Sequence, residues 1–140
     1  MKALLSRQVG GPGTLTLEEV ADPAPGPGQV LLAMRACGLN FPDALLIRDQ
    51  YQLRPPRPFS PGGEVAGIVL DGGDGVTHVR AGERVLAMPG WGGLATRVVA
   101  DAVALELRPE LVGRQELEDE RALGPRKREV GRRDGDRAGD

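Results

Sequence analysis

Glycine and proline recur throughout this chain and divide most of it into short segments. The 140 residues include 21 glycines and 12 prolines, which cluster between short runs rich in Val, Leu and Ala. Such runs, separated by turn residues at fairly even spacing, are typical of all-β barrels and sandwiches. The sequence therefore predicts a mainly β fold, with strands near residues 3–6, 15–20, 30–38, 64–70, 83–88, 94–100 and 103–107.

One short helix is predicted over residues 41–49. Asn40 suits the N-cap position, Pro42 is well tolerated in the first turn, and the side chain of Asp43 can reach back to the cap as in a capping box. We expect Leu45 and Leu46, together with the earlier Phe41, to face the core.

The composition changes abruptly after residue 107. Residues 108–140 carry almost as many charged side chains as the whole of residues 1–107, and their apolar residues are too few to offset the entropy of ordering them. A short helix near residues 113–123 is possible, and we expect the rest of 110–140 to be a charged, disordered tail. Because Arg, Gly, Glu and Asp are what GC-rich codons yield out of frame, we hypothesise a frameshift or truncated gene; a natural charged extension is the alternative.

Charge and composition exclude several functions. A net charge of −2 provides no positive field for nucleic acid or an anionic membrane, and an aromatic content of 3% leaves little for base stacking. The single cysteine, Cys37, cannot form an internal disulfide. The longest apolar runs are far shorter than a membrane span, and the first residues lack the apolar region of a signal peptide. We therefore expect a cytoplasmic protein that binds neither nucleic acid nor membranes.

Several motifs in the first 109 residues carry a family resemblance. They are CGLNFPD at 37–43, Tyr51, PGGEVAGIV at 61–69, PGPGQV at 25–30, GVTHVRAGERV at 75–85 and GGLA at 92–95. With these motifs, the chain resembles the zinc-free quinone oxidoreductase (zeta-crystallin-like) branch of the medium-chain dehydrogenase/reductase superfamily. The resemblance implies that residues 1–109 form the GroES-like catalytic domain, a partly open β-barrel with one or two short helices. Its partner in the family, a Rossmann domain, is expected to be absent from this chain.

Zinc is not expected. In the zinc alcohol dehydrogenases of the superfamily, the metal cysteine falls where Asn40 stands and the metal histidine where Gly63 stands. Cys37 lies three residues too early and is expected to be a core thiol, while His78, the only histidine, is expected in a solvated loop.

The resemblance also implies a set of site residues. The expected catalytic side chains are those of Asn40 and Tyr51, and NADPH is expected to contact Asn40, Phe41, Asp43, Gly63 and Glu64. Each has a simpler interpretation. Asn40 and Asp43 can serve the helix terminus alone, Tyr51 can be packing, Glu64 can pair with an arginine, and Gly63 can permit close backbone approach.

A second glycine motif, GWGGLA at 90–95, fits the dinucleotide fingerprint G-x-G-x-x-A. That fingerprint should open a long helix, yet the following residues, TRVV at 96–99, are rich in β-branched side chains and favour a strand. We therefore predict a glycine-rich turn between two strands.

The function implied by the resemblance is hydride transfer from NADPH to a quinone or enone without a metal. The family's pyrophosphate-binding turn lies beyond residue 140, so this chain is expected to be inactive alone. The alternative is a stand-alone GroES-like binding or assembly module. The identity of the acceptor, the choice of NADPH over NADH and the oligomeric state stay open.

Overall fold

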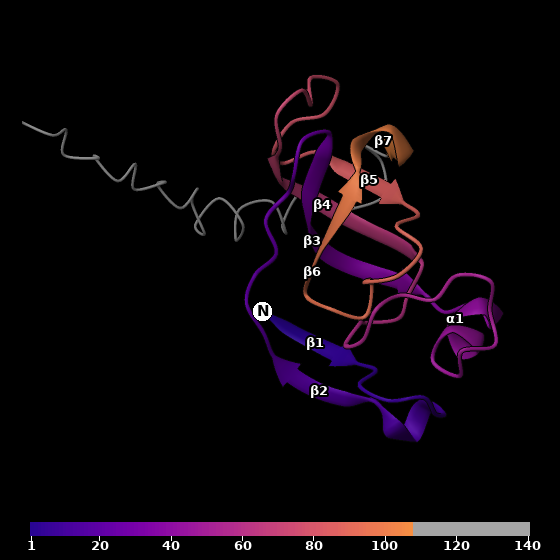
Figure 1. Ribbon diagram of the computed structural model, residues 1–140. Coiled ribbons are helices and arrows are strands. Elements are labelled where there is room, and N and C mark those ends of the chain that lie inside the picture. Colours follow the sequence, from indigo (N-terminus) through magenta and orange to yellow (C-terminus); the bar gives the residue numbers. More distant parts are fainter. Residues whose placement is uncertain (108–140) are drawn as a thin grey trace, which may run out of the picture.

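The computed structural model describes residues 1–107, which form two antiparallel β-sheets and one α-helix. The small sheet pairs β1 (Lys2–Leu5) with β2 (Thr16–Glu19) (Figure 1). The large sheet has the order β6-β3-β4-β5-β7. Its strands are β3 (Gln29–Gly38), β4 (Glu64–Gly72), β5 (Arg84–Ala87), β6 (Arg97–Asp101) and β7 (Leu105–Leu107). The remaining elements are α1 (Phe41–Leu46) and two 3₁₀ turns, Pro12–Thr14 and Ala102–Ala104.

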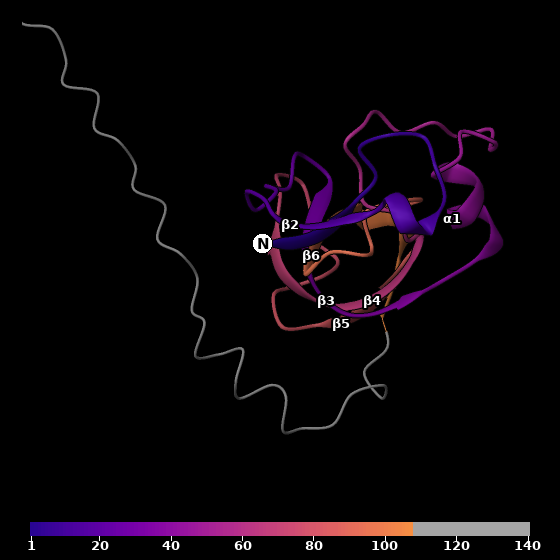
Figure 2. The ribbon, with the colours of Figure 1, turned by 90° about the horizontal axis from the view of Figure 1, so that it is seen from below.

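The large sheet curves into a partly open barrel, which confirms the predicted fold class. Strands β3, β4 and β5 form a curved wall, and β1 and β2 lie across its concave side (Figure 2). The curvature has a local cause, because the β3–β4 register shifts between Leu31 and Leu32 and again between Met34 and Ala36. In the ladders of the described residues, β6 and β7 each pair on one side only, so the barrel does not close.

The main core fills the concave side of this sheet. Val30 and Leu32 of β3 are completely buried, and Val65, Val69 and Val85 pack with them from β4 and β5. Buried and half-buried positions alternate along β5 and the first part of β3, whereas Gly67, Ile68 and Val69 of β4 are buried in succession. A core of branched aliphatic side chains therefore holds the sheet in its curved form.

A smaller core fixes α1 to the long loop that follows it. Leu46, Ile47 and Phe59 are buried together there. Arg57 packs on this cluster. Its guanidinium pairs with Asp49 at 2.7 Å, and its Cζ lies 5.4 Å from the centroid of the Phe59 ring.

Helix α1 is shorter than predicted and one expectation about its faces was wrong. It ends at Leu46 rather than near residue 49, where Asp49 adopts a left-handed backbone with φ 56°. Phe41 does not face the core: its side chain is 76% exposed, whereas Leu46 is 2% exposed. At the first position of so short a helix, the ring projects away from the face that packs on the Phe59 cluster.

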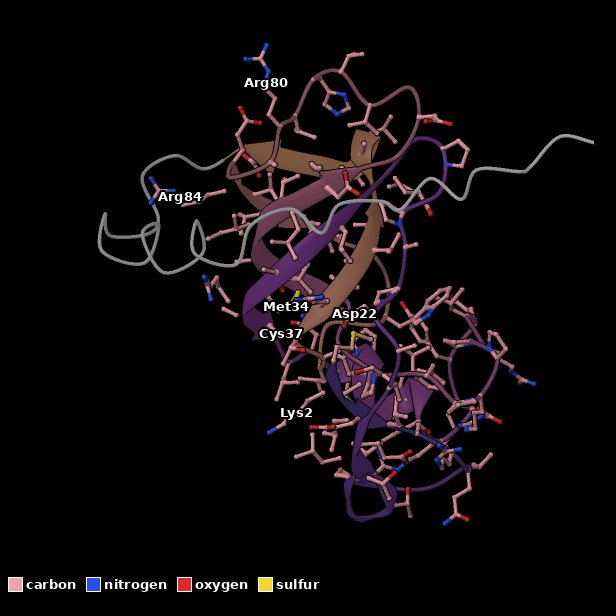
Figure 3. All side chains as sticks on the ribbon, turned by 90° about the vertical axis from the view of Figure 1, so that its left-hand side faces the viewer. Lys2, Asp22, Met34, Cys37, Arg80 and Arg84 are labelled. Atoms are coloured by element: carbon pink, nitrogen blue, oxygen red, sulfur yellow. The ribbon has the colours of Figure 1, made fainter. Side chains whose placement is uncertain are left out.

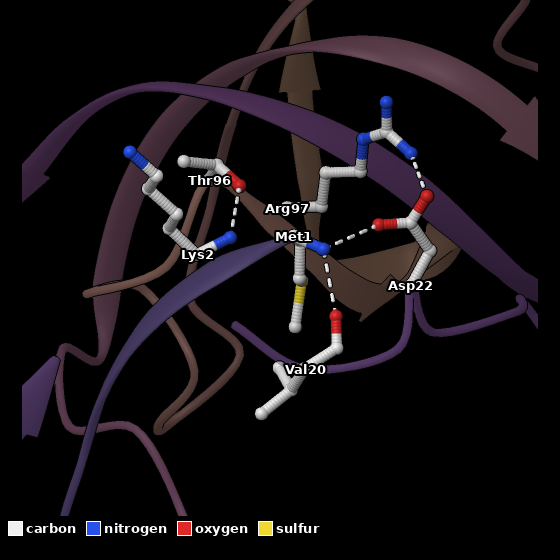
Figure 4. Close-up of polar contacts among 6 residues, drawn as sticks. All are labelled: Met1, Lys2, Val20, Asp22, Thr96 and Arg97. Carbon is white, nitrogen blue, oxygen red and sulfur yellow. Dashed lines mark hydrogen bonds and ion pairs between the residues drawn. The ribbon is translucent and has the colours of Figure 1, made fainter. Parts of the chain in front are cut away.

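The N-terminal ribbon is tied to β6 by polar contacts (Figure 4). The ammonium group of Met1 donates to the carbonyl of Val20 at 2.7 Å and pairs with Asp22 at 3.0 Å. Arg97 of β6 forms an ion pair with the same carboxylate, and the Lys2 backbone N–H donates to Thr96 Oγ1 at 3.2 Å.

No helix within residues 1–107 is long and apolar enough to cross a membrane.

Candidate functional site

A pocket of about 470 Å³ lies where β3 runs into α1 and β4 begins. It has a polar side, an apolar side and a glycine-containing edge. The lining residues are Asn40, Pro42, Asp43, Leu46, Tyr51, Leu53, Gly63, Glu64, Met88 and Gly90. Five of the six residues predicted for the site are among them. The sixth, Phe41, does not line the pocket. It is the residue that follows Asn40 in sequence, and its ring is exposed.

The start of α1 places Asn40 and Asp43 on the polar side. Asn40 is the N-cap, with extended backbone angles, and its N–H donates to Asp43 Oδ2 at 2.8 Å. This is the reach-back contact of a capping box, as predicted. Asp43 Oδ1 accepts a second bond from the N–H of Gly62 at 2.9 Å, and the Asp43 side chain is buried. One carboxylate therefore holds the helix start against the loop that leads into β4.

Glu64, the first residue of β4, supplies the other carboxylate. Its Oε2 accepts a hydrogen bond from Nδ2 of Asn40 at 2.9 Å. This hydrogen bond therefore gives the carboxylate an amide partner from the helix cap. The contact joins residues 24 positions apart.

The apolar side of the pocket comes from separate segments. Leu46 belongs to α1 and is buried, while Tyr51 is half-buried and packs against the Phe59 cluster. Leu53 and Met88 are 40% and 74% exposed and complete this side. Sequence reasoning missed both: Leu53 is a single apolar residue in a loop, and Met88, at the end of the predicted strand 83–88, lies just beyond β5.

Close backbone packing explains the glycines beneath the pocket. Gly62 has φ 100°, and a Cβ there would lie 2.6 Å from the Cys37 sulfur. A Cβ on Gly63 would lie 2.9 Å from the carbonyl oxygen of Gly90. The predicted role in backbone approach is therefore confirmed for Gly63, which also lines the pocket.

Cys37 lies behind this glycine layer and packs against the main core, as predicted for a core thiol. Burial raises the pKa of its thiol, and the nearby carboxylates of Asp43 and Glu64 raise it further. Figure 3 shows Cys37 well apart from the labelled Arg80 and Arg84. The thiol is thus disfavoured as a thiolate nucleophile.

Two other sequence predictions concern loops. His78 is exposed, as expected, but its ring also hydrogen-bonds the Ala102 carbonyl at 2.8 Å through Nε2. The GWGGLA motif connects β5 to β6 and opens no helix, which confirms the turn prediction. Among residues 1–107, no three or more His, Cys, Asp or Glu side chains are grouped so that they could hold a metal ion.

The curved antiparallel sheet, with a half-polar pocket at the end of β3, defines a small, mainly β domain. Residues 26–110 match the alcohol dehydrogenase GroES-like domain family. The chain therefore belongs to that family and, with it, to the medium-chain dehydrogenase/reductase superfamily.

Relatives and solved structures agree with this assignment. The chain is 40% identical to quinone oxidoreductase-like protein 2 of Rattus norvegicus over 102 residues, which are 73% of this chain and 29% of that protein. The crystal structure of human synaptic vesicle membrane protein VAT-1 homolog-like protein aligns with a TM-score of 0.75 and 31% identity, covering 81% of this chain and 37% of that one. Escherichia coli quinone oxidoreductase, solved in complex with NADPH, aligns with a TM-score of 0.74 and 28% identity, covering 81% and 35%. The chain thus spans about a third of the length of these relatives.

Proposed function

We propose that residues 1–107 form the acceptor-binding part of an NADPH-dependent reductase that transfers hydride to a quinone or enone without a metal. The observation that supports this most is the pocket itself, which brings Asn40, Tyr51, Asp43, Gly63 and Glu64 together from separate segments. The NADPH complex of the Escherichia coli relative supports the choice of cofactor. The cytoplasmic location and the small-molecule acceptor stay predictions.

The pocket fits one part of NADPH. Its polar lining contains the carboxylates of Asp43 and Glu64 and neither lysine nor arginine. Such a lining suits ribose hydroxyls and an uncharged ring and repels phosphate groups. The described part of the chain also contains only one α-helix, and its N-terminus already carries Asp43. We therefore assign the nicotinamide and its ribose to this pocket and expect the phosphates to be held by residues beyond 107.

The chemistry divides between the cofactor and these side chains. Bound NADPH supplies the hydride. The amide of Asn40 and the hydroxyl of Tyr51 can donate hydrogen bonds to a carbonyl oxygen on which negative charge develops. The two carboxylates can stabilise the positive charge that a nicotinamide gains as it loses hydride. Leu46, Leu53 and Met88 present an apolar wall to a planar acceptor and keep water from it.

The experiment uses the purified chain labelled with ¹⁵N. We expect NADPH to shift the backbone amide signals of Gly63, Glu64 and Gly90, while 2′-phospho-ADP-ribose, which lacks the nicotinamide, leaves them in place. Menadione should shift signals of the same pocket with NADPH present, because hydride transfer requires both molecules to be bound side by side. Spectra unchanged by NADPH and by menadione would reject the proposal and favour the binding or assembly module.

Elemental analysis of protein purified without chelators should find no stoichiometric zinc.

A further inference from the structure

Asn40 is hydrogen-bonded to Asp43 in the helix cap, where its carbonyl also accepts the Asp43 N–H at 3.0 Å, and to Glu64 of β4. Its backbone N–H is bound by Asp43 of the same helix at 2.8 Å, and its side-chain nitrogen is bound by Glu64 of β4 at 2.9 Å. The first contact is local and belongs to the helix cap. The second comes from a different element and acts only on the orientation of the side-chain amide.

The strand opposite Glu64 leaves space for this contact. Gly38 pairs with Glu64 in the β3–β4 ladder. A Cβ added at Gly38 would lie 2.8 Å from Oε2 of Glu64 and 3.2 Å from its Cδ. The backbone of Gly38 is not left-handed, so the obstacle to a side chain there is the Glu64 carboxylate and not the backbone conformation. A larger residue at 38 would displace the carboxylate that binds Asn40.

We propose that Glu64 is a positioning residue, which fixes the orientation of the Asn40 side-chain amide at the pocket, and that Gly38 leaves the room this requires. A carboxylate can only accept hydrogen bonds, so it selects the orientation in which the NH₂ group of Asn40 faces it. That group has two hydrogens, and only one is donated to Glu64. The other is left for a carbonyl oxygen of a bound molecule, a use that rests on the function proposed above.

The positioning is tested without any ligand, through the side-chain NH₂ signals of Asn40. In the wild-type chain we expect two well-separated proton signals, one of them with the small temperature dependence of a hydrogen-bonded proton. Glu64→Ala should remove this signature. Glu64→Gln should retain it in part, because the Gln side chain keeps an acceptor but loses the charge.

Gly38→Ala is the sharper variant, because it deletes no functional group. It should change the Asn40 signals as Glu64→Ala does, since the flexible end of Glu64 can move away at small cost to the fold. The matched control is Gly13→Ala, where an added Cβ meets nothing within 4 Å. If the Asn40 signals stay at wild-type values in folded Glu64→Ala or Gly38→Ala protein, the positioning role is overturned.

The ligand readout separates this inference from the proposed function. If both hold, NADPH or menadione binding should weaken by about threefold to tenfold in Glu64→Ala and in Gly38→Ala, as expected for one misplaced hydrogen bond. Wild-type affinity in both variants, despite changed Asn40 signals, would overturn the role of this orientation in binding. Absence of ligand binding in the wild-type chain would overturn the proposed function, and the Asn40 signals would still decide the positioning.

Discussion

At the scale of single residues, Asp43 combines a buried side chain with two hydrogen bonds to backbone groups. Its buried carboxylate accepts one backbone N–H from Asn40 and one from Gly62. Hydrogen bonds to an ionised acceptor are stronger than neutral ones, and a buried donor left unpaired is costly. The helix start and the Gly62 loop therefore depend on the same side chain.

Asp43→Asn should accordingly destabilise the fold by about 2–3 kcal/mol, because the new NH₂ group would face one of two N–H donors. Chemical denaturation followed by circular dichroism measures the change. Asp74→Asn, at an exposed loop position, is the control. A loss at residue 43 no larger than the loss at residue 74 would show that the two backbone bonds carry little stability.

At the scale of elements, the β1–β2 ribbon depends on an exposed ion pair as well as on its ladder. Arg7, just after β1, binds Glu18 of β2 through two hydrogen bonds at 2.7 and 2.6 Å. These bonds, together with one from the Thr16 hydroxyl, lower the pKa of Glu18 from 4.5 to about 2. Because the pair is open to solvent, salt should weaken it.

The lowered pKa of Glu18 gives a pH dependence with a defined sign. The folded state prefers the ionised form, so the stabilisation is complete above pH 4.5 and is lost as the pH falls from about 4.5 to about 2. We therefore expect the stability difference between wild type and Glu18→Gln to shrink over that interval in urea unfolding at several pH values. Glu19→Gln, at the exposed neighbouring position, gives the background effect of removing one acid. A Glu18→Gln difference that is constant between pH 6 and pH 2 contradicts the assignment.

At the scale of the whole molecule, the curved sheet and its core account for the fold of residues 1–107. The central pairings of β3 with β4 and β6, and of β4 with β5, join segments far apart in sequence. The last strand, β7, ends at Leu107. From their charged composition, residues 110–140 are predicted to add nothing to this core.

Deletion of residues 110–140 should therefore leave both the midpoint and the slope of urea unfolding unchanged, since the slope follows the surface exposed on unfolding. The full chain is the reference, measured at equal concentration. A lower midpoint together with a smaller slope in the shortened chain would show that the last residues bury surface against the domain. That result would also argue against the frameshift hypothesis, because out-of-frame residues are not selected to pack.

The sequence alone determined the strand pattern, the N-cap of α1 and the turn at residues 90–95. These features depend on local rules: short apolar runs between turn residues, capping chemistry, and the preference of glycine for turns and of β-branched residues for strands. The family motifs also indicated five of the residues that line the pocket. Local rules failed at Phe41, where packing of so short a helix decided which side chains are buried.

Only the tertiary structure decided which side chains meet. The pairing of Asn40 with Glu64 depends on the register of β3 and β4, and the space for it depends on Gly38 across the ladder. Leu53 and Met88 reach the pocket from two unrelated loops. Such contacts are set by where the sheet curves and how its loops return, and these depend on the packing of the whole core rather than on any local pattern.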